Sequence, residues 1–259
     1  MNGNLFMIHG MYAGPWMWEH YRGWFEARDW QCVATALRHR DNQPGGPPDP
    51  RLGKVSLLDF AQDLEDEIRR LDRKPVVMGH SMGGLLAQIL GSRGLAAALV
   101  LVAPAAPAGI PVTSPSVTKS FLGQFLQWAF WRKPVLMSYA DSRFGAMNRL
   151  SEEDARRIYG RYSHESGRAL FEMGLWPLDG KRASRVDELK IDVPVLVLVG
   201  DRDRMTPPAV ARKIAAKYRS VSTLKVLPGH GHTLPAEPGW EEIAAFIEDW
   251  LMQTVPGSE

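Results

Sequence analysis

Residues 76–86, with the sequence VVMGHSMGGLL, decide the fold of this chain. The apolar run Val76 to Met78 leads directly into Gly79-His80-Ser81-Met82-Gly83, and an apolar helical pattern follows. When Gly-x-Ser-x-Gly joins a strand to a helix in this way, the serine lies on a strained turn that exposes its hydroxyl at the end of a sheet. The glycines allow the strand and helix backbones to approach closely. The pattern therefore predicts Ser81 as a nucleophile; the alternative is a serine that only caps a helix after a glycine-rich turn.

Other short apolar runs predict the rest of a parallel sheet. Their residues are apolar at successive positions, which indicates strands covered on both faces. Helical patterns alternate with them, and the first begins behind Ser56 with Asp59 three residues later, a capping-box arrangement. This alternation predicts a doubly wound α/β sheet flanked by helices. The predicted strands lie at Leu5 to Ile8, Leu99 to Val102, Val195 to Val199 and near Leu224 to Leu227, and the predicted helices at residues 57–71, 82–90 and 240–251.

The alternation stops in residues 105–189, where the sequence becomes aromatic and helical without a strong strand pattern. This predicts a core of residues 1–104 and 190–259 with one helical insertion. Within the insertion, Ser151 is expected to cap a helix that runs toward His164.

Aromatic side chains of the insertion are candidates for substrate contacts. Four of them have the spacing of one apolar helix face. Such a stripe belongs more often to a core, yet beside a predicted active site it also suggests an apolar pocket. We therefore expect Trp128 and Trp131, together with Tyr12 from the first loop, to contact the substrate. The stripe consists of Phe121, Phe125, Trp128 and Trp131.

A serine hydroxyl is a weak nucleophile, so it needs a base and a carboxylate that orients the base. The loop GDRDRMTP at residues 200–207 follows a predicted strand, at the sheet edge where α/β folds collect active residues. Asp203 is predicted as the acid because it stands three residues beyond Gly200, where the strand ends. Asp201 is the alternative, although its position also suits a cap of the turn or a pair with an arginine.

The base is expected between the last strand and the C-terminal helix, in the loop PGHGHT at residues 228–233. His232 is predicted because it lies nearer the helix, and His230 is the alternative. The developing oxyanion needs backbone N–H donors. One is expected from Met82, directly after the nucleophile, and the other from Met11, in the His-Gly loop after the first strand.

The composition excludes several classes of partner and cofactor. The formal net charge is +2 over 259 residues, so no basic surplus indicates nucleic acid or a membrane surface. The single cysteine, Cys32, cannot form an intramolecular disulfide, and no Cys/His cluster has metal-ligand spacing. The N-terminus lacks the basic region of a signal peptide. We expect a cytoplasmic protein that needs no cofactor or metal and acts on a small, apolar, ester-like substrate; the oligomeric state is not indicated.

The chain resembles the α/β-hydrolase superfamily in its serine turn and in its opening, Phe6-Met7-Ile8-His9-Gly10 followed by Trp16-Met17-Trp18. It is most similar to small bacterial esterase-like members and more distantly to plant methylesterases and hydroxynitrile lyases. The resemblance implies that residues 105–189 form a helical cap over the active site. Ser81 argues against dehalogenases and epoxide hydrolases, which use an Asp nucleophile. Gly10 and Thr233 stand where hydroxynitrile lyases place Thr and Lys, which argues against lyase activity.

These observations predict hydrolysis of a carboxylic ester, or of a thioester, through an acyl-enzyme. One alternative is a lyase or a carbon–carbon hydrolase that uses the same triad, because fold and triad do not decide the reaction. Another is a ligand-binding, receptor-like protein with negligible turnover. A burst of alcohol release from a chromogenic ester would distinguish an esterase from both.

Overall fold

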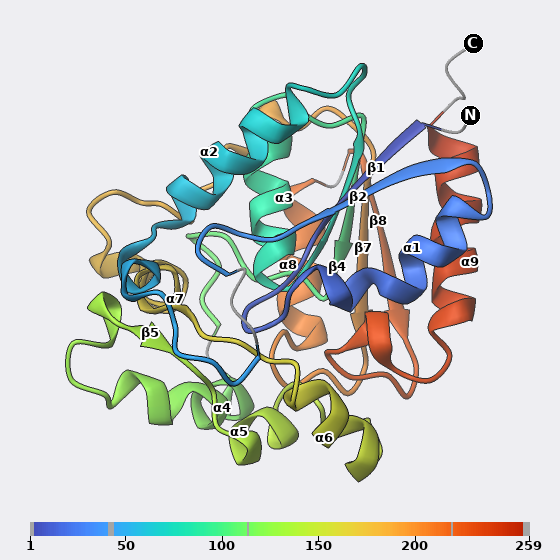
Figure 1. Cartoon of the computed structure of the whole chain (residues 1–259). Helices are drawn as coiled ribbons and strands as arrows, with labels where there is room; N and C mark the ends of the chain where they lie inside the picture. The colour runs from blue at the N-terminus through green and yellow to red at the C-terminus, as the bar shows by residue number, and fades with distance from the viewer. Residues whose placement is uncertain (1–2, 41–43, 113, 219, 256–259) are drawn as a thin grey trace.

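The central sheet agrees with the predicted fold class. The computed structural model describes residues 3–40, 44–112, 114–218 and 220–255. Among these residues, six parallel strands form the sheet in the order β2-β1-β3-β4-β7-β8 (Figure 1). The predicted strands are all present, as β1 Gly3–Ile8, β3 Val76–His80, β4 Ala98–Val102, β7 Val195–Gly200 and β8 Ser222–Leu227.

Strand β2, Trp30–Thr35, was not predicted from the sequence. It pairs with β1 at one edge of the sheet, and most of its residues are half-buried. An edge strand with this mixed sequence, WQCVAT, has neither the continuous apolar run of a buried strand nor a clear alternation. Its pairing with β1 is therefore a tertiary feature.

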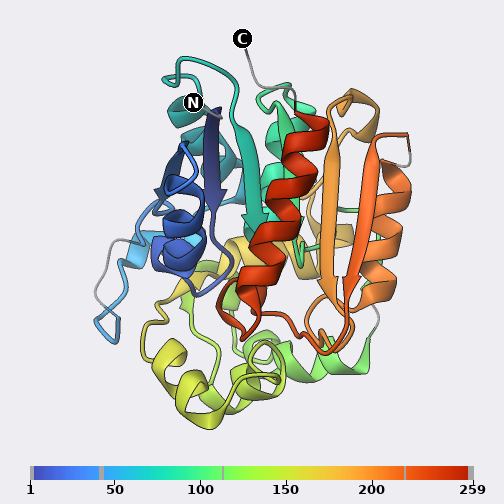
Figure 2. The same cartoon turned by 90° about the vertical axis from the view of Figure 1, so that its right-hand side faces the viewer.

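Both faces of the sheet are buried, and each face has its own hydrophobic cluster. Successive residues of a strand point to opposite sides of the sheet, so they belong to different clusters. On β1, Phe6 and Ile8 belong to one hydrophobic cluster, whereas Leu5 and Met7 belong to another. The first cluster includes residues of α2 Leu57–Ile68, α3 Met82–Ser92 and α8 Pro208–Lys217, and the second includes residues of α1 Glu19–Glu26 and α9 Trp240–Thr254. Figure 2 shows α1 and α9 on the same face of the sheet. No described helix is both long enough and apolar enough to span a bilayer.

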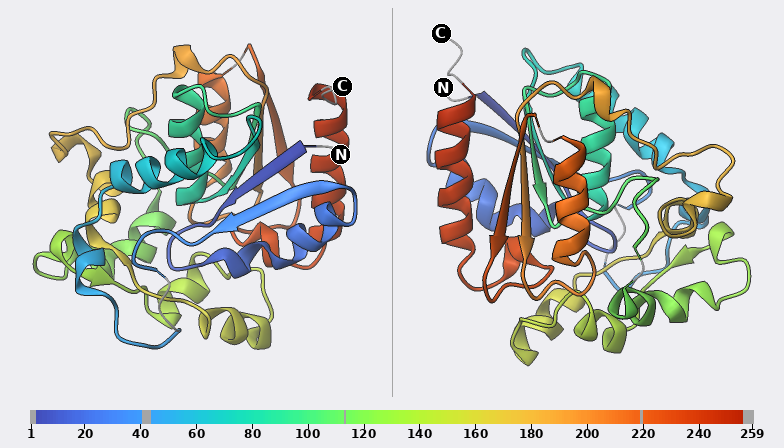
Figure 3. Two further views of the ribbon diagram at one scale, coloured as in Figure 1. Left: turned by 45° about the horizontal axis from the view of Figure 1, so that its top comes forward. Right: turned by 180° about the vertical axis from the view of Figure 1, so that it is seen from behind.

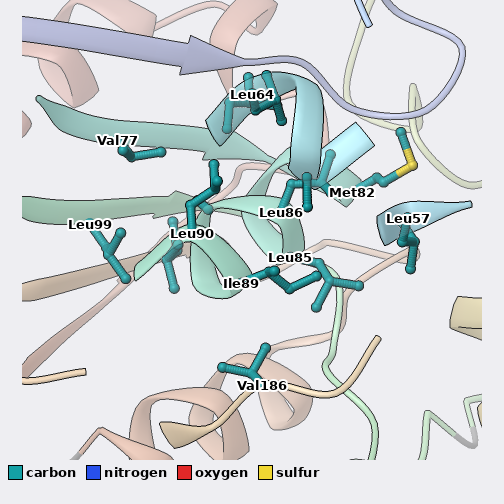
Figure 4. Close-up of a cluster of buried hydrophobic side chains, with 14 of the residues drawn as sticks. Leu57, Leu64, Val77, Met82, Leu85, Leu86, Ile89, Leu90, Leu99 and Val186 are labelled. Carbon is teal, nitrogen blue, oxygen red and sulfur yellow. The ribbon is translucent and has the colours of Figure 1, made fainter. Parts of the chain in front are cut away.

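Helix α3 is buried from Met82 to Gly91. Its leucines pack among strand residues such as Val77 and Leu99, and on its other side it meets α2 (Figure 4). A helix held on several sides cannot rotate freely. The turn that joins it to β3, at Ser81, is therefore held in one orientation.

The segment between β4 and β7 lies across the carboxyl ends of the strands, as Figures 1 and 3 show. We call its residues 105–189 the cap segment. It contains four α-helices among the described residues and a short antiparallel strand pair. The helix that begins behind Ser151 ends at Tyr159, before His164. The elements are α4 Pro115–Phe125, β5 Pro134–Val135, α5 Tyr139–Phe144, α6 Glu152–Tyr159, β6 Glu165–Ser166 and α7 Gly167–Gly174.

The prediction of one continuous aromatic helix face in this segment is wrong. Helix α4 ends at Phe125, and the chain turns at Ala129, which has a left-handed φ of 56°. Beyond the turn, Trp131 lies in a separate 3-10 helix. Trp128 lies before the turn with 84% of its surface exposed. The helical spacing therefore does not place these two tryptophans on the face that Phe121 and Phe125 share.

Buried carboxylates attach the cap segment to the rest of the chain. Glu172 of α7 accepts a hydrogen bond from the hydroxyl of Ser56, the residue that caps α2, at 2.9 Å. Glu165 pairs with Arg40, and both side chains are fully buried. Arg40 also donates to the carbonyl of Ala13 in the loop after β1. Removing one member of a buried ion pair leaves an unpaired charge and costs about 3–5 kcal/mol, so these contacts hold the segment in place.

Candidate active site

Ser81 lies on a strained turn between β3 and α3. Its φ of 54° and ψ of −117° are unusual for a residue with a side chain, and such strain costs on the order of 1–3 kcal/mol. Backbone hydrogen bonds maintain it: the Ser81 amide donates to Val102 at 3.0 Å, and its carbonyl accepts from Ala105 at 2.8 Å. In the described chain, the Ser81 side chain makes no capping bond to α3. The geometry differs from that of a helix cap and suits the predicted role of Ser81, which stays a prediction.

Two glycines of the motif are required by close contacts. A Cβ atom at Gly79 would lie 2.1 Å from the carbonyl oxygen of Gly83, and a Cβ atom at Gly83 would lie 2.1 Å from the carbonyl oxygen of Ile8. No side chain fits at such distances. The glycines therefore bring α3 against β3 and β1, which is the physical reason for the Gly-x-Ser-x-Gly pattern.

Asp203 and His232 come together at the same edge of the sheet. The Nδ1 atom of His232 lies 2.9 Å from Oδ2 of Asp203, and both side chains are almost fully buried. The other carboxylate oxygen, Oδ1, accepts the amides of Met205 at 2.7 Å and Thr206 at 2.8 Å. These bonds hold the carboxylate with one oxygen toward the imidazole.

The surroundings of His232 determine which nitrogen carries the proton. The Thr206 hydroxyl donates its one proton to the carbonyl of Ala103, at 3.0 Å, and lies 3.2 Å from Nδ1 of His232. It therefore faces Nδ1 as an acceptor, as the Asp203 carboxylate does. Two acceptors around Nδ1 place the proton there, and the neutral ring then has Nε2 as its basic nitrogen.

The two alternative residues have other contacts. Asp201 is exposed, accepts the Gly229 amide at 2.7 Å and lies 3.6 Å from Arg202. His230 lies 3.2 Å from the buried carboxylate of Glu237. The structure thus brings together Asp203 and His232, and it leaves Asp201 and His230 outside this pair.

His80, next to Ser81, also contacts His232. Its Nε2 donates to the carbonyl of His232 at 2.9 Å, and the two ring centroids are 4.9 Å apart. Burial, and secondarily the nearby His232, lowers the pKa of His80 to about 3. His80 is therefore neutral near pH 7, and it links the end of β3 to the histidine loop.

The residues expected to supply the oxyanion donors lie beside Ser81. Met82 is the first residue of α3, where backbone amides have no partner within the helix. Met11 lines the same cavity as Ser81. A Cβ atom at Gly10 would lie 3.0 Å from Cβ of Ser81, so glycine lets the Met11 loop approach the turn. The positions suit the role, which stays a prediction.

Comparison with known proteins identifies the family. A model described as "Alpha/beta hydrolase family" matches residues 5–246. The chain belongs to the alpha/beta hydrolase family. A monoacylglycerol lipase of Mycolicibacterium smegmatis is 30% identical over an alignment of 265 positions, which covers 96% of this chain and 88% of the relative.

Solved structures of the same fold are also similar to this α/β hydrolase. A monoacylglycerol lipase from Paleococcus ferrophilus superimposes with a TM-score of 0.70 at 20% identity, over 97% of this chain and 94% of that one. A methylesterase from Arabidopsis also has a TM-score of 0.70, at 13% identity, over 96% of this chain and 98% of that one. The resemblance inferred from the serine turn and the chain opening is confirmed.

Two cavities of this α/β hydrolase meet at Ser81. The larger has a volume of about 260 Å³ and the smaller about 30 Å³. Tyr12 lines the smaller one, and its contact with a substrate stays a prediction. Trp128 and Trp131 are not among the described residues that line either cavity, because the chain turns away after α4.

Two residues of the site were not predicted from the sequence. Thr206, which faces the Nδ1 atom of His232, was part of the predicted acid loop but had no predicted role. Glu237 holds the histidine loop by accepting the amides of Gly231 at 2.8 Å and Thr233 at 3.0 Å. An acidic residue just before a C-terminal helix is a common feature, so no local signal identified it.

Proposed function

We propose that this α/β hydrolase cleaves carboxylic esters of small molecules, with Ser81 as the nucleophile, His232 as the base and Asp203 as the acid. The observation that carries the proposal is the 2.9 Å contact between Asp203 and Nδ1 of His232, beside a strained serine that lines the same cavity as His232. The 30% identity to a monoacylglycerol lipase supports ester chemistry.

The reaction follows from these positions. Ser81 Oγ attacks the carbonyl carbon of the ester while its proton passes to Nε2 of His232. The amides of Met11 and Met82 stabilise the oxyanion of the tetrahedral intermediate. When the intermediate collapses, the bond to the alcohol oxygen breaks, and His232 gives the proton to the departing alcohol. Water then attacks the acyl-enzyme by the same relay, and the acid leaves Ser81 free.

Asp203 and the cap segment support this chemistry. The Asp203 carboxylate stabilises the imidazolium that forms when His232 takes the proton. In this proposal the cap segment, residues 105–189, covers the acyl group and limits access of water to it. A thioester would react by the same steps. The chemistry in the names of the relatives favours hydrolysis over the lyase, carbon–carbon hydrolase and receptor-like alternatives.

Labelling with a fluorophosphonate tests the proposal. The serine oxygen of an activated serine displaces fluoride from the probe and forms a phosphonate ester, so we expect one modified peptide that contains Ser81. The Ser81→Ala variant is the control and should remain unlabelled. A label on another serine, or the same label in the variant, would refute the assignment of the nucleophile. Absence of any label and of any ester turnover would refute the proposed function.

A further inference from the structure

The two cavities at Ser81 differ in which of the proposed catalytic residues line them. Ser81 and Met11 line both. Among the described residues, Met82, which carries one expected oxyanion donor, lines the larger cavity only. His232 lines the smaller cavity only. The nucleophile therefore lies between a side that contains the proposed base and a side that does not.

The chemistry of the proposed reaction distinguishes these sides. In the tetrahedral intermediate, the acyl carbon carries the serine oxygen, the oxyanion, the acyl chain and the alcohol oxygen. His232 must reach the alcohol oxygen, because it donates the proton that lets the alcohol leave. The alcohol therefore lies on the side of His232. The acyl chain has no such requirement and lies on the other side.

We infer, on the basis of the proposed ester hydrolysis, that the larger cavity binds an apolar acyl chain and the smaller cavity binds a small alcohol group such as methyl. The substrates of this α/β hydrolase are then esters of apolar acids with small alcohols. The inference rests on the division of the proposed catalytic residues between two cavities of very different volume.

The larger cavity suits an acyl chain in volume and lining. Its volume of about 260 Å³ is larger than that of an engineered apolar cavity, about 150 Å³, which binds benzene. Helices α4 and α7 supply much of its wall, and the described residues that line it include no charged side chain. Burial of each methylene group there is favourable because apolar surface leaves water. Lining residues from the cap segment include Ile110, Val117, Phe121, Phe125, Leu170 and Met173.

The smaller cavity suits only a small group. Its volume of about 30 Å³, against about 260 Å³ for the larger cavity, leaves room for a group of only a few atoms. Its walls are held in place: Tyr12, Met137 and Tyr162 are buried in one hydrophobic cluster. The rings of Tyr12 and Tyr162 stack at 6.0 Å, and the Tyr12 hydroxyl donates to Gln124 at 3.3 Å. A longer alcohol would have to displace packed side chains.

Isomeric esters test the inference on the unmodified protein. Methyl hexanoate and pentyl acetate have the same atoms, but the long chain is on the acyl side in the first and on the alcohol side in the second. We expect kcat/KM to rise about fourfold per methylene from methyl acetate to methyl hexanoate, which corresponds to about 0.8 kcal/mol each. The kcat/KM of pentyl acetate should not exceed that of methyl acetate. Glyceryl hexanoate should be cleaved more slowly than methyl hexanoate.

Variants in the two walls give a second test. Val117→Trp places a large side chain in the acyl cavity at a half-exposed position of α4, and should lower the ratio of methyl hexanoate to methyl acetate turnover at least tenfold. The matched control is Leu126→Trp, just beyond α4 and 75% exposed, which should leave the ratio unchanged. Met137→Ala enlarges the smaller cavity and should raise turnover of pentyl acetate relative to methyl acetate. Its melting temperature shows whether it folds.

The outcomes separate this inference from the proposed function. A preference for pentyl acetate over methyl hexanoate would overturn the assignment of the cavities, as would equal rates for the two isomers, while ester hydrolysis itself would stand. No turnover of any ester, together with no fluorophosphonate labelling, would instead overturn the proposed function. If Met137→Ala does not fold, the isomer comparison and Val117→Trp still decide.

Discussion

Replacement of Asp203 with asparagine probes the role of the acid with little change in shape. In the wild-type protein, Oδ1 of Asp203 accepts the amides of Met205 and Thr206, and Oδ2 faces Nδ1 of His232. In Asp203→Asn, the amide oxygen keeps the two backbone bonds, so its NH₂ group faces the imidazole. An NH₂ group only donates, so Nδ1 of His232 must become the acceptor. The imidazole proton then moves to Nε2.

The change of tautomer determines how far turnover falls in Asp203→Asn. With its proton on Nε2, His232 cannot accept the proton of Ser81. In the serine protease case, the corresponding substitution lowers turnover by about ten thousandfold, or about 5 kcal/mol of transition-state stabilisation. Asp201→Asn is the matched control: its oxygen still accepts the Gly229 amide, and only an exposed charge pair with Arg202 is lost. Such a pair contributes about 1 kcal/mol or less.

The assay is steady-state turnover of methyl hexanoate by the two variants and the wild-type protein, with circular dichroism to verify folding. We expect the variants to differ by about three orders of magnitude or more. Small, equal losses in both would mean that the acid lies elsewhere, for example beyond β4. A large loss in Asp201→Asn alone would mean that the acid was misplaced by two residues.

Three further predictions follow from the same geometry. Ser81→Ala should lower turnover on the order of a millionfold without loss of fold, and retention of a few percent of activity would contradict its role. His232→Ala should cost about as much, whereas His230→Ala should cost little; the reverse result would exchange the two roles. His80 has a folded-state pKa of about 3, below the unfolded value, so its contribution to stability is full above about pH 6.5 and decreases as the pH falls toward 3. Between pH 7 and pH 5 the wild type should therefore lose about 2 kcal/mol of unfolding free energy more than His80→Gln does, as measured by denaturant titration. An equal loss in both proteins would mean that the pKa of His80 is not lowered.

The serine turn and most of the sheet could be predicted because their signals are local. Ser81 is bracketed by glycines that close backbone contacts require, and the strands beside it are continuous apolar runs. The loop residues were harder to predict. Asp203 and Asp201 are two positions apart in one turn, and only the first is directed to His232. Position relative to the strand end favoured Asp203, but the folded loop shows which carboxylate is buried.

By itself, the sequence determined the fold class, the serine turn and the two loops that face it, since these depend on periodicity and on residues adjacent along the chain. Only the tertiary structure decided the edge strand β2, the end of helix α4 before Trp128, and the contacts of Thr206 and Glu237. It also decided that two cavities of unequal volume meet at Ser81. Their walls come from segments far apart in the chain, and packing among such segments leaves no pattern in the local sequence.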